Sequence, residues 1–185
     1  MSGSGPGSDV DEVLTRLIRD VPDFPKPGVL FKDISPLLAD HDGLTTVVHA
    51  LASAGRDAEG RPVVDKVVGI EARGFILAAP VALALGAGFV PVRKEGKLPG
   101  PVHRVSYALE YADAVLELHE DAVRPGERVL VVDDVLATGG TIEAALRLVD
   151  SCGGEVVGAA VLLELGFLDG RRLLRDLPLL ALHTV

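Results

Sequence analysis

The segment from Val129 to Thr141, VLVVDDVLATGGT, restricts the possible folds of this chain more than any other. Residues 129–132 are apolar without alternation, which is typical of a strand buried on both faces of a parallel sheet. Two acids, Asp133 and Asp134, follow where that strand is expected to end. From Ile142 onward, apolar residues recur at three- and four-residue spacing, which predicts an amphipathic helix. The segment therefore predicts a strand, a short loop and a helix.

The loop between this strand and this helix has the chemistry of a phosphate site. The first turn of a helix presents unpaired N–H groups and a partial positive charge. Gly139 and Gly140 allow the backbone to approach a phosphate closely, and Thr138 and Thr141 add hydroxyl donors. The preceding acids would repel a phosphate, so we expect them to face ribose hydroxyls or a divalent cation. The expected ligand is a sugar phosphate, although an ordinary glycine turn between strand and helix is the simpler alternative.

Composition limits the class of protein. The 185 residues are 48% hydrophobic and 24% charged, which predicts one globular domain with a sizeable core. The net charge of −9 argues against nucleic acid as a general partner, because phosphate contacts need Lys and Arg. A lone cysteine, Cys152, excludes an intrachain disulfide and fits a reducing compartment. No signal peptide or apolar run of about 18 residues is visible, so we expect a cytoplasmic protein without a membrane partner.

The rest of the chain alternates between helical and strand patterns. Residues 1–8, MSGSGPGS, are low in complexity and expected to be disordered, and residues 9–185 are expected to form one domain. Helices are expected at 10–21, 44–54, 75–85 and 168–174, and further strands at 67–70, 87–92, 114–120, 156–163 and 179–183. This order predicts an α/β fold with a mainly parallel twisted sheet flanked by helices.

Residues 23–38, DFPKPGVLFKDISPLL, do not fit either pattern. Closely spaced prolines exclude a helix at the start of this segment and predict a fixed, irregular conformation. Phe24, Leu30 and Phe31 are apolar in this loop-like context. Such side chains either pack the loop down or line a flat ligand, and composition alone favours packing.

Charged residues follow three of the predicted strands, at the ends where α/β sheets bind ligands. Glu71 and Arg73 follow the first, residues 93–97 (RKEGK) follow the second, and the acid pair 133–134 follows the third. We expect these three clusters to meet at one edge of the sheet.

The segment VVDDVLATGGT resembles the phosphoribosyl pyrophosphate signature of type I phosphoribosyltransferases. The segments DFPKPGVLFKDISPLL, GIEARGF, VRKEGKLPG and YALEY resemble, in the same order, the members of that family that use adenine. The resemblance covers roughly residues 10–183. It implies transfer of the 5-phosphoribosyl group from phosphoribosyl pyrophosphate to adenine with Mg²⁺, giving AMP and pyrophosphate in purine salvage. It also implies a small hood or flap region and a homodimer, for which the apolar segment after Arg73 is a candidate interface.

The resemblance also assigns roles at the phosphoribosyl end of the site. Arg73 and the backbone of residues 71–73 should bind pyrophosphate, with a non-proline cis peptide at Glu71–Ala72. Lys94 and Lys97 are candidate helpers, although exposed lysines are equally often solvated. Asp133 and Asp134 should serve the ribose hydroxyls, with Mg²⁺ near them and held mainly by substrate. The loop Ala137, Thr138, Gly139, Gly140 and Thr141 should hold the 5′-phosphate.

At the base end, the resemblance places adenine beside Leu30, Phe31 and Lys32. Glu110, in the flap segment YALEY, should handle the proton of the base, and Tyr111 should pack or hydrogen-bond beside it; without the resemblance, Glu110 reads as a surface residue. Lys32 stands where some members have Arg, which changes a planar group into a point charge. Ala112 stands where many members have Gly, so we expect a stiffer flap here than in those members.

Two alternative functions are compatible with the shared signature. The first is a phosphoribosyltransferase for another purine base, namely hypoxanthine, guanine or xanthine. The second is a non-catalytic regulator that senses phosphoribosyl pyrophosphate. A regulator would need a DNA-binding module, and the chain has neither a basic helix-turn-helix pattern nor a suitable charge.

Overall fold

The computed structural model describes residues 6–108 and 113–185. The chain divides into two compact units, residues 1–50 and 51–185, each of which is described by itself. Among the described residues, no helix is long and apolar enough to cross a membrane.

The first unit contains a short antiparallel sheet and helices. The helix α1 (Pro6–Leu17) is followed by β1 (Arg19–Pro22), β2 (Leu30–Asp33), α2 (Ser35–Ala39) and the beginning of α3 (His41–Ala52). The expected helix over 10–21 is therefore wrong beyond residue 17, because Val21 pairs with Phe31 across the two strands. The irregular conformation expected over residues 23–38 is also wrong in part, because this segment contains β2 and most of α2. The turn between the strands contains a cis Phe24–Pro25 bond, and the Gly28 N–H donates a 2.8 Å hydrogen bond to Asp23 Oδ1 across it.

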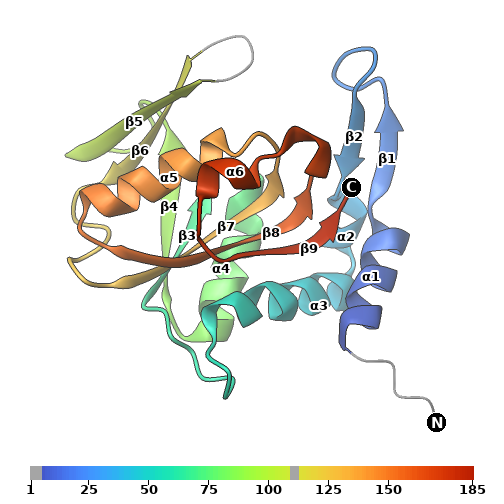
Figure 1. The fold of residues 1–185 in the computed structure, drawn as a ribbon, viewed down its shortest axis with the longest axis horizontal. Coiled ribbons are helices and arrows are strands. Elements are labelled where there is room, and N and C mark those ends of the chain that lie inside the picture. Colours follow the sequence, from blue (N-terminus) through green and yellow to red (C-terminus); the bar gives the residue numbers. More distant parts are fainter. Residues whose placement is uncertain (1–5, 109–112) are drawn as a thin grey trace. The chain divides into compact units, whose positions relative to one another are not determined.

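The second unit is built on a seven-stranded sheet with the order β5-β6-β4-β3-β7-β8-β9. Five of its strands, β4, β3, β7, β8 and β9, run parallel, and β6 and β5 are added antiparallel at one edge. The strands are β3 (Lys66–Ile70), β4 (Gly88–Lys94), β5 (Val102–Ala108), β6 (Asp113–His119), β7 (Arg128–Leu136), β8 (Glu155–Glu164) and β9 (Leu179–Thr184). The helices are η1 (Ser53–Gly55), α4 (Arg73–Leu85), α5 (Gly140–Ser151), η2 (Gly166–Leu168) and α6 (Arg171–Leu174). The expected mainly parallel α/β sheet is confirmed (Figure 1).

The two long helices of this unit cover opposite faces of the sheet. Val131 of β7 belongs to the same buried cluster as Ala145 and Val149 of α5. On the other face, a Cβ placed on Gly69 of β3 would lie only 2.7 Å from the Cβ of Ala78 in α4. Alternate residues of β3 and β7 therefore face α4 and α5 in turn, which explains the continuous apolar runs of these two strands. Cys152 is buried beside α5 as expected, and burial raises the pKa of its thiol.

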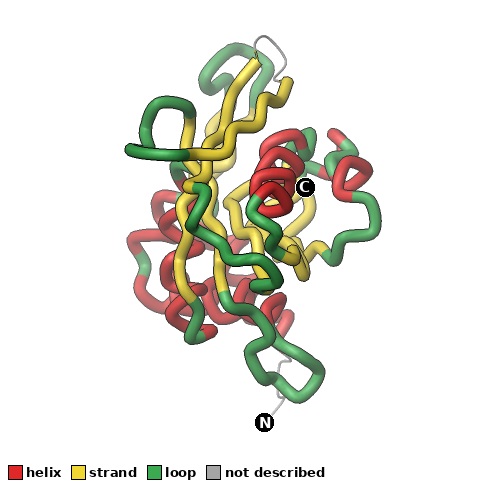
Figure 2. The backbone as a smooth tube through the Cα atoms, turned by 90° about the vertical axis from the view of Figure 1, so that its left-hand side faces the viewer, coloured by secondary structure: helices red, strands yellow, loops and turns green. Residues whose placement is uncertain are grey.

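Three details of the second unit differ from expectation. Strand β7 continues to Leu136 because Val135 and Leu136 pair with Leu163 and Glu164 of β8, so the acid pair lies inside the strand. The expected helix over 168–174 divides into η2 and α6. Strand β5 was not expected, because its polar residues alternate in a segment that was assigned to a flap. Figures 1 and 2 show that the β5–β6 hairpin projects beyond the rest of the sheet.

Candidate active site

Two buried acids lie side by side at the carboxyl end of β7. Asp133 and Asp134 are both buried, and Asp133 Oδ1 accepts a 2.9 Å hydrogen bond from the Asp134 N–H. Burial, and next the negative charge of Asp134, raise the pKa of the Asp133 carboxyl well above its usual value. The acid pair therefore carries an electrostatic cost in the free protein, and hydroxyl donors or a cation would relieve it.

Arg73 brings a positive charge to this pair from the first turn of α4. Its Nε lies 2.7 Å from Asp134 Oδ2, but that oxygen accepts no well-aligned hydrogen bond from the described residues. Gly74 makes the approach possible, because a Cβ on it would lie 2.7 Å from Asp133 Oδ1. Two of the charged clusters expected at neighbouring strand ends are thus in contact, as predicted.

Glu71, at the end of β3, joins this edge to the end of β4. Its carboxylate lies 2.6 Å from Lys97 Nζ and 3.2 Å from Arg93 Nε, and it accepts a 3.0 Å hydrogen bond from the Lys94 N–H. Burial opposes ionisation of this carboxyl, but the hydrogen bonds from Lys97, Lys94 and Arg93 outweigh it and lower the pKa of Glu71 to about 2. The Glu71–Ala72 peptide bond is cis, as the resemblance implies.

The two candidate lysines differ in their surroundings. The ammonium group of Lys97 is neutralised by Glu71, whereas that of Lys94 is exposed and forms no ion pair with any described residue. Sequence reasoning missed Glu117 of β6, which is fully buried and accepts hydrogen bonds from Arg104 Nε at 2.8 Å and the Gly96 N–H at 3.0 Å. Glu117 thereby fixes the loop that carries Lys97. Its place in an alternating strand resembled that of a surface residue, so the sequence held no signal for this role.

The loop of residues 137–141 forms the connection between β7 and α5. Gly139 adopts φ +88°, in the left-handed region that favours glycine, and caps α5 without a side-chain hydrogen bond. The N–H groups of the first turn of α5 are therefore not occupied by a side-chain cap. Thr138 is exposed and Thr141 is half-buried, so both hydroxyls lie near the surface. The geometry agrees with an anion site at the N-terminus of a twelve-residue helix.

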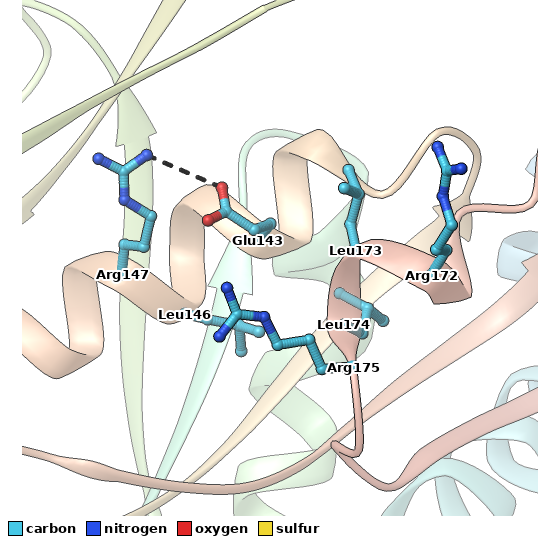
Figure 3. A pocket seen from close by; sticks show the side chains of 7 residues that line it. All are labelled: Glu143, Leu146, Arg147, Arg172, Leu173, Leu174 and Arg175. Carbon is cyan, nitrogen blue, oxygen red and sulfur yellow. Dashed lines mark ion pairs between the residues drawn. The ribbon is translucent and has the colours of Figure 1, made fainter.

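A separate pocket of about 680 Å³ lies between α5 and α6 (Figure 3). Figure 3 shows Arg175 reaching toward Leu146 of α5, while Arg172 points away from Glu143 and Arg147. The pocket is lined by Glu143, Leu146, Arg147, Arg172, Leu173, Leu174 and Arg175. None of the residues that the sequence assigned to the site lines it.

In the first unit, the aromatic strip around β2 is open to solvent. Leu30 is 52% exposed, and Phe24 is similarly exposed while its ring meets that of Phe31 edge-on at 5.1 Å between centroids. Phe24 therefore packs against Phe31 as composition favours, while half of the Phe24 and Leu30 side chains stays accessible to a ligand. The ammonium of Lys32 lies 2.7 Å from Asp20 Oδ1 across the strand pair.

Two of the residues assigned to chemistry, Glu110 and Tyr111, lie outside the described residues, as does Ala112. The strands on either side of them, β5 and β6, pair antiparallel from Ala108 and Asp113 onward. The roles of Glu110 and Tyr111 stay predictions.

Comparisons with known proteins agree with this geometry. Residues 36–173 match the family profile described as "Phosphoribosyl transferase domain". An adenine phosphoribosyltransferase from Nocardioides sp. is 66% identical over 169 residues, which cover 91% of each chain, and one from Thermobifida fusca is 57% identical over 96% of this chain and 99% of the relative. This chain belongs to the adenine phosphoribosyltransferase family.

Solved structures of the adenine phosphoribosyltransferase family share the fold. The enzyme from Rhodothermus marinus is 50% identical with a TM-score of 0.87, over 96% of this chain and 99% of that one. The Saccharomyces cerevisiae enzyme, solved with an imino-altritol bisphosphate and adenine, is 35% identical with a TM-score of 0.89, over 95% and 99% of the two chains. The protein is thus a pentosyltransferase of the type I phosphoribosyltransferase fold.

Proposed function

We propose that this enzyme transfers the 5-phosphoribosyl group of phosphoribosyl pyrophosphate to adenine, which yields AMP and pyrophosphate for purine salvage. The observation that carries the proposal is the contact between Arg73 and the buried Asp133–Asp134 pair, beside a helix N-terminus that has no side-chain cap. An activated ribose phosphate requires a cation, acids and an anion site. Arg73, the acid pair and the N-terminus of α5 supply these three groups at one edge of one sheet.

The ribose and its 5′-phosphate are assigned to the β7–α5 connection. The N–H groups of residues 137–141 and the hydroxyls of Thr138 and Thr141 would bind the phosphate. Asp133 and Asp134 would accept hydrogen bonds from the ribose diol. Such bonds to a charged acceptor are stronger than neutral ones, and they would relieve the repulsion that raises the pKa of Asp133.

The leaving pyrophosphate is assigned to the backbone of residues 71–73 and to Arg73. Negative charge grows on it as the bond to the ribose carbon breaks, and the guanidinium would offset part of that charge. Lys94 is the more available of the two lysines, because Lys97 already neutralises Glu71.

Mg²⁺ fits this site as a substrate-borne ion. No group of three or more His, Cys, Asp or Glu capable of holding a metal occurs among residues 6–108 and 113–185. Mg²⁺ is commonly bound by one or two carboxylates together with substrate phosphates, and Asp134 Oδ2 lacks a hydrogen bond. Bound there, the ion would neutralise part of the charge on pyrophosphate. Asp133 and Asp134 are the residues that would hold it, directly or through water.

The base is assigned to the exposed strip of β2. Leu30 and Phe31 would cover the flat faces of adenine, and Lys32 would lie beside them. Adenine attacks through a ring nitrogen that must lose a proton, and Glu110 is proposed as the acceptor, with Tyr111 supporting it. A flap that carries the segment YALEY would keep water from the cationic ribose during transfer.

The enzyme is proposed to act as a cytoplasmic homodimer, with residues 9–185 as one phosphoribosyltransferase domain. Support for the dimer comes from α4, whose outer face carries exposed Ile76 and Leu83, the latter 83% exposed. Large apolar side chains spaced along one helix face are typical of a surface that a partner covers.

One assay tests the reaction and the base together. Pyrophosphate release would be measured with adenine, hypoxanthine, guanine and xanthine, for the wild type and for Glu110→Gln. We expect release with adenine alone and a strong reduction in the variant. Release with another purine would assign the enzyme to that base, and full turnover by Glu110→Gln would remove Glu110 from the mechanism.

A further inference from the structure

Gly170, at the beginning of α6, packs backbone to backbone against the proposed phosphate loop. A Cβ on Gly170 would collide with the carbonyl oxygen of Ala137 and would lie 3.0 Å from the Gly139 nitrogen. A Cβ on Gly139 would in turn collide with the carbonyl oxygen of Gly170. Only residues without side chains allow two backbones to approach this closely, so α6 and the loop are in direct contact.

The neighbour of Gly170 in sequence, Arg171, is fixed by a two-point ion pair. Its Nε lies 2.6 Å from Glu164 Oε1 and its Nη2 lies 2.7 Å from Glu164 Oε2. The planar guanidinium matches the carboxylate at two points, which defines orientation as well as distance. The side chain of Glu164 is only 9% exposed, whereas that of Arg171 is 49% exposed, so the carboxylate is the protected partner of this pair.

Glu164 is itself attached to the strand that leads into the loop. It is the last residue of β8 and lies opposite Leu136, the last residue of β7. The next residue, Leu165, donates a 2.9 Å hydrogen bond from its N–H to the Leu136 carbonyl oxygen. Ala137 then begins the loop. The contacts therefore form a closed ring that runs from Leu136 through the loop to Gly170, then through Arg171 and Glu164 back to Leu136.

We propose that Glu164 and Arg171 are positioning residues for the 5′-phosphate of the substrate. Their ion pair holds Gly170 against residues 137–139, and that contact sets the direction of the N–H groups that face the phosphate. The pair acts through the Gly170 backbone. This inference rests on the proposed function, because it uses the assignment of residues 137–141 to the 5′-phosphate.

The test compares two neighbouring arginines and two ligands. Arg171→Met removes the pair, whereas Arg172→Met changes the next residue of α6, whose side chain is 82% exposed and lies 3.9 Å from its nearest acid, Asp169. Calorimetry would measure binding of ribose 5-phosphate, which uses the loop, and of pyrophosphate, which uses the site at Arg73. We expect Arg171→Met to weaken ribose 5-phosphate binding roughly 10- to 100-fold, since small misplacements of binding groups have effects of this size. Pyrophosphate binding by Arg171→Met, and both affinities of Arg172→Met, should stay within about twofold of wild type.

Arg171→Lys keeps the charge beside Glu164 but loses the two-point geometry, and it serves as the deciding variant if Arg171→Met does not fold. We expect it to weaken ribose 5-phosphate binding to an intermediate degree and to leave pyrophosphate binding unchanged. Unchanged ribose 5-phosphate binding in both variants would overturn the inference, as would equal weakening of the two ligands, which would indicate general destabilisation. Failure of the wild type to bind ribose 5-phosphate would instead overturn the proposed function, and this inference with it.

Discussion

Acids at the carboxyl ends of β3 and β7 lie at the same edge of the sheet, but the charges that surround them are opposite in sign. At β3, Glu71 is surrounded by Lys97, Arg93 and a backbone N–H, and its pKa is lowered to about 2. At β7, Asp133 is buried beside another acid, and its pKa is raised. The first cluster is complete without a ligand and stabilises the fold. The second is incomplete, and the free protein carries a cost that substrate is positioned to relieve.

Removing charge at β7 should produce the largest effect on function. Asp133→Asn keeps an oxygen for the Asp134 N–H but replaces an ionised acceptor of the ribose diol. We expect phosphoribosyl pyrophosphate to bind on the order of 10- to 100-fold more weakly, because hydrogen bonds to charged groups contribute about 1.5–3 kcal/mol. Steady-state kinetics and calorimetry would measure this loss, with Asp150→Asn on the exposed face of α5 as a control.

The same variant should be more stable than the wild type when no ligand is bound. An acid whose pKa is raised by folding makes its ionised form unfavourable in the native state at every pH above its usual value, 3.8. Wild-type stability should therefore decline as pH rises from 3.8 through the folded-state pKa, and Asp133→Asn should lack this decline. Thermal melting without ligand would measure it, and a lower melting temperature for the variant at pH 7 would contradict the comparison.

At the end of β3 we expect the opposite change of stability with pH. The pKa of Glu71 falls from 4.5 to about 2 on folding, so the ionised carboxylate stabilises the protein above pH 4.5, by less than the shift alone implies because solvent screens its ion pairs. This stability should be lost as pH falls from 4.5 toward 2, and Glu71→Gln should lose it at all pH values. Denaturant unfolding between pH 3 and pH 7 would show a flatter profile for the variant. A profile parallel to that of the wild type would mean that the cluster contributes no net stability.

The smallest effect is expected from the lysines of the loop after β4. Lys97→Met leaves Glu71 with one cation fewer and should lower stability by about 1 kcal/mol, because the lysine is half exposed and solvent screens its charge. Lys94→Met should leave stability unchanged and affect only pyrophosphate binding, since its ammonium has no partner among the described residues. Melting curves of the two variants, measured side by side, would separate the roles of the two lysines. Equal destabilisation would show that the ion pair between Lys97 and Glu71 adds no stability of its own.

The fold and the phosphate loop could be predicted because their signals are local. An unbroken apolar run followed by acids, small residues and a helical period describes β7, its loop and α5 within one short segment. The meeting of Glu71, Arg73 and the acid pair could also be anticipated, because parallel strands end at one edge.

The remaining contacts depend on pairings between distant residues. Glu117 meets Arg104 only because β5 and β6 form a hairpin, and the alternation of β6 gave no sign of a buried charge. Glu164 follows the predicted strand 156–163 and Arg171 lies within the predicted helix 168–174, and their pairing depends on how η2 turns the chain. The continuation of β7 past its acids was missed because partner-strand length, rather than local composition, decides where a strand ends.

The close approach of Gly139 and Gly170 has a consequence for how this enzyme tolerates change. A side chain on Gly139 would collide with the Gly170 carbonyl oxygen, and one on Gly170 with the Ala137 carbonyl oxygen, so neither position tolerates a side chain. A library randomised at the two codons should return glycine at both after selection for adenine salvage. Adjacent exposed codons, such as that of Arg172, should return a broad mixture of amino acids.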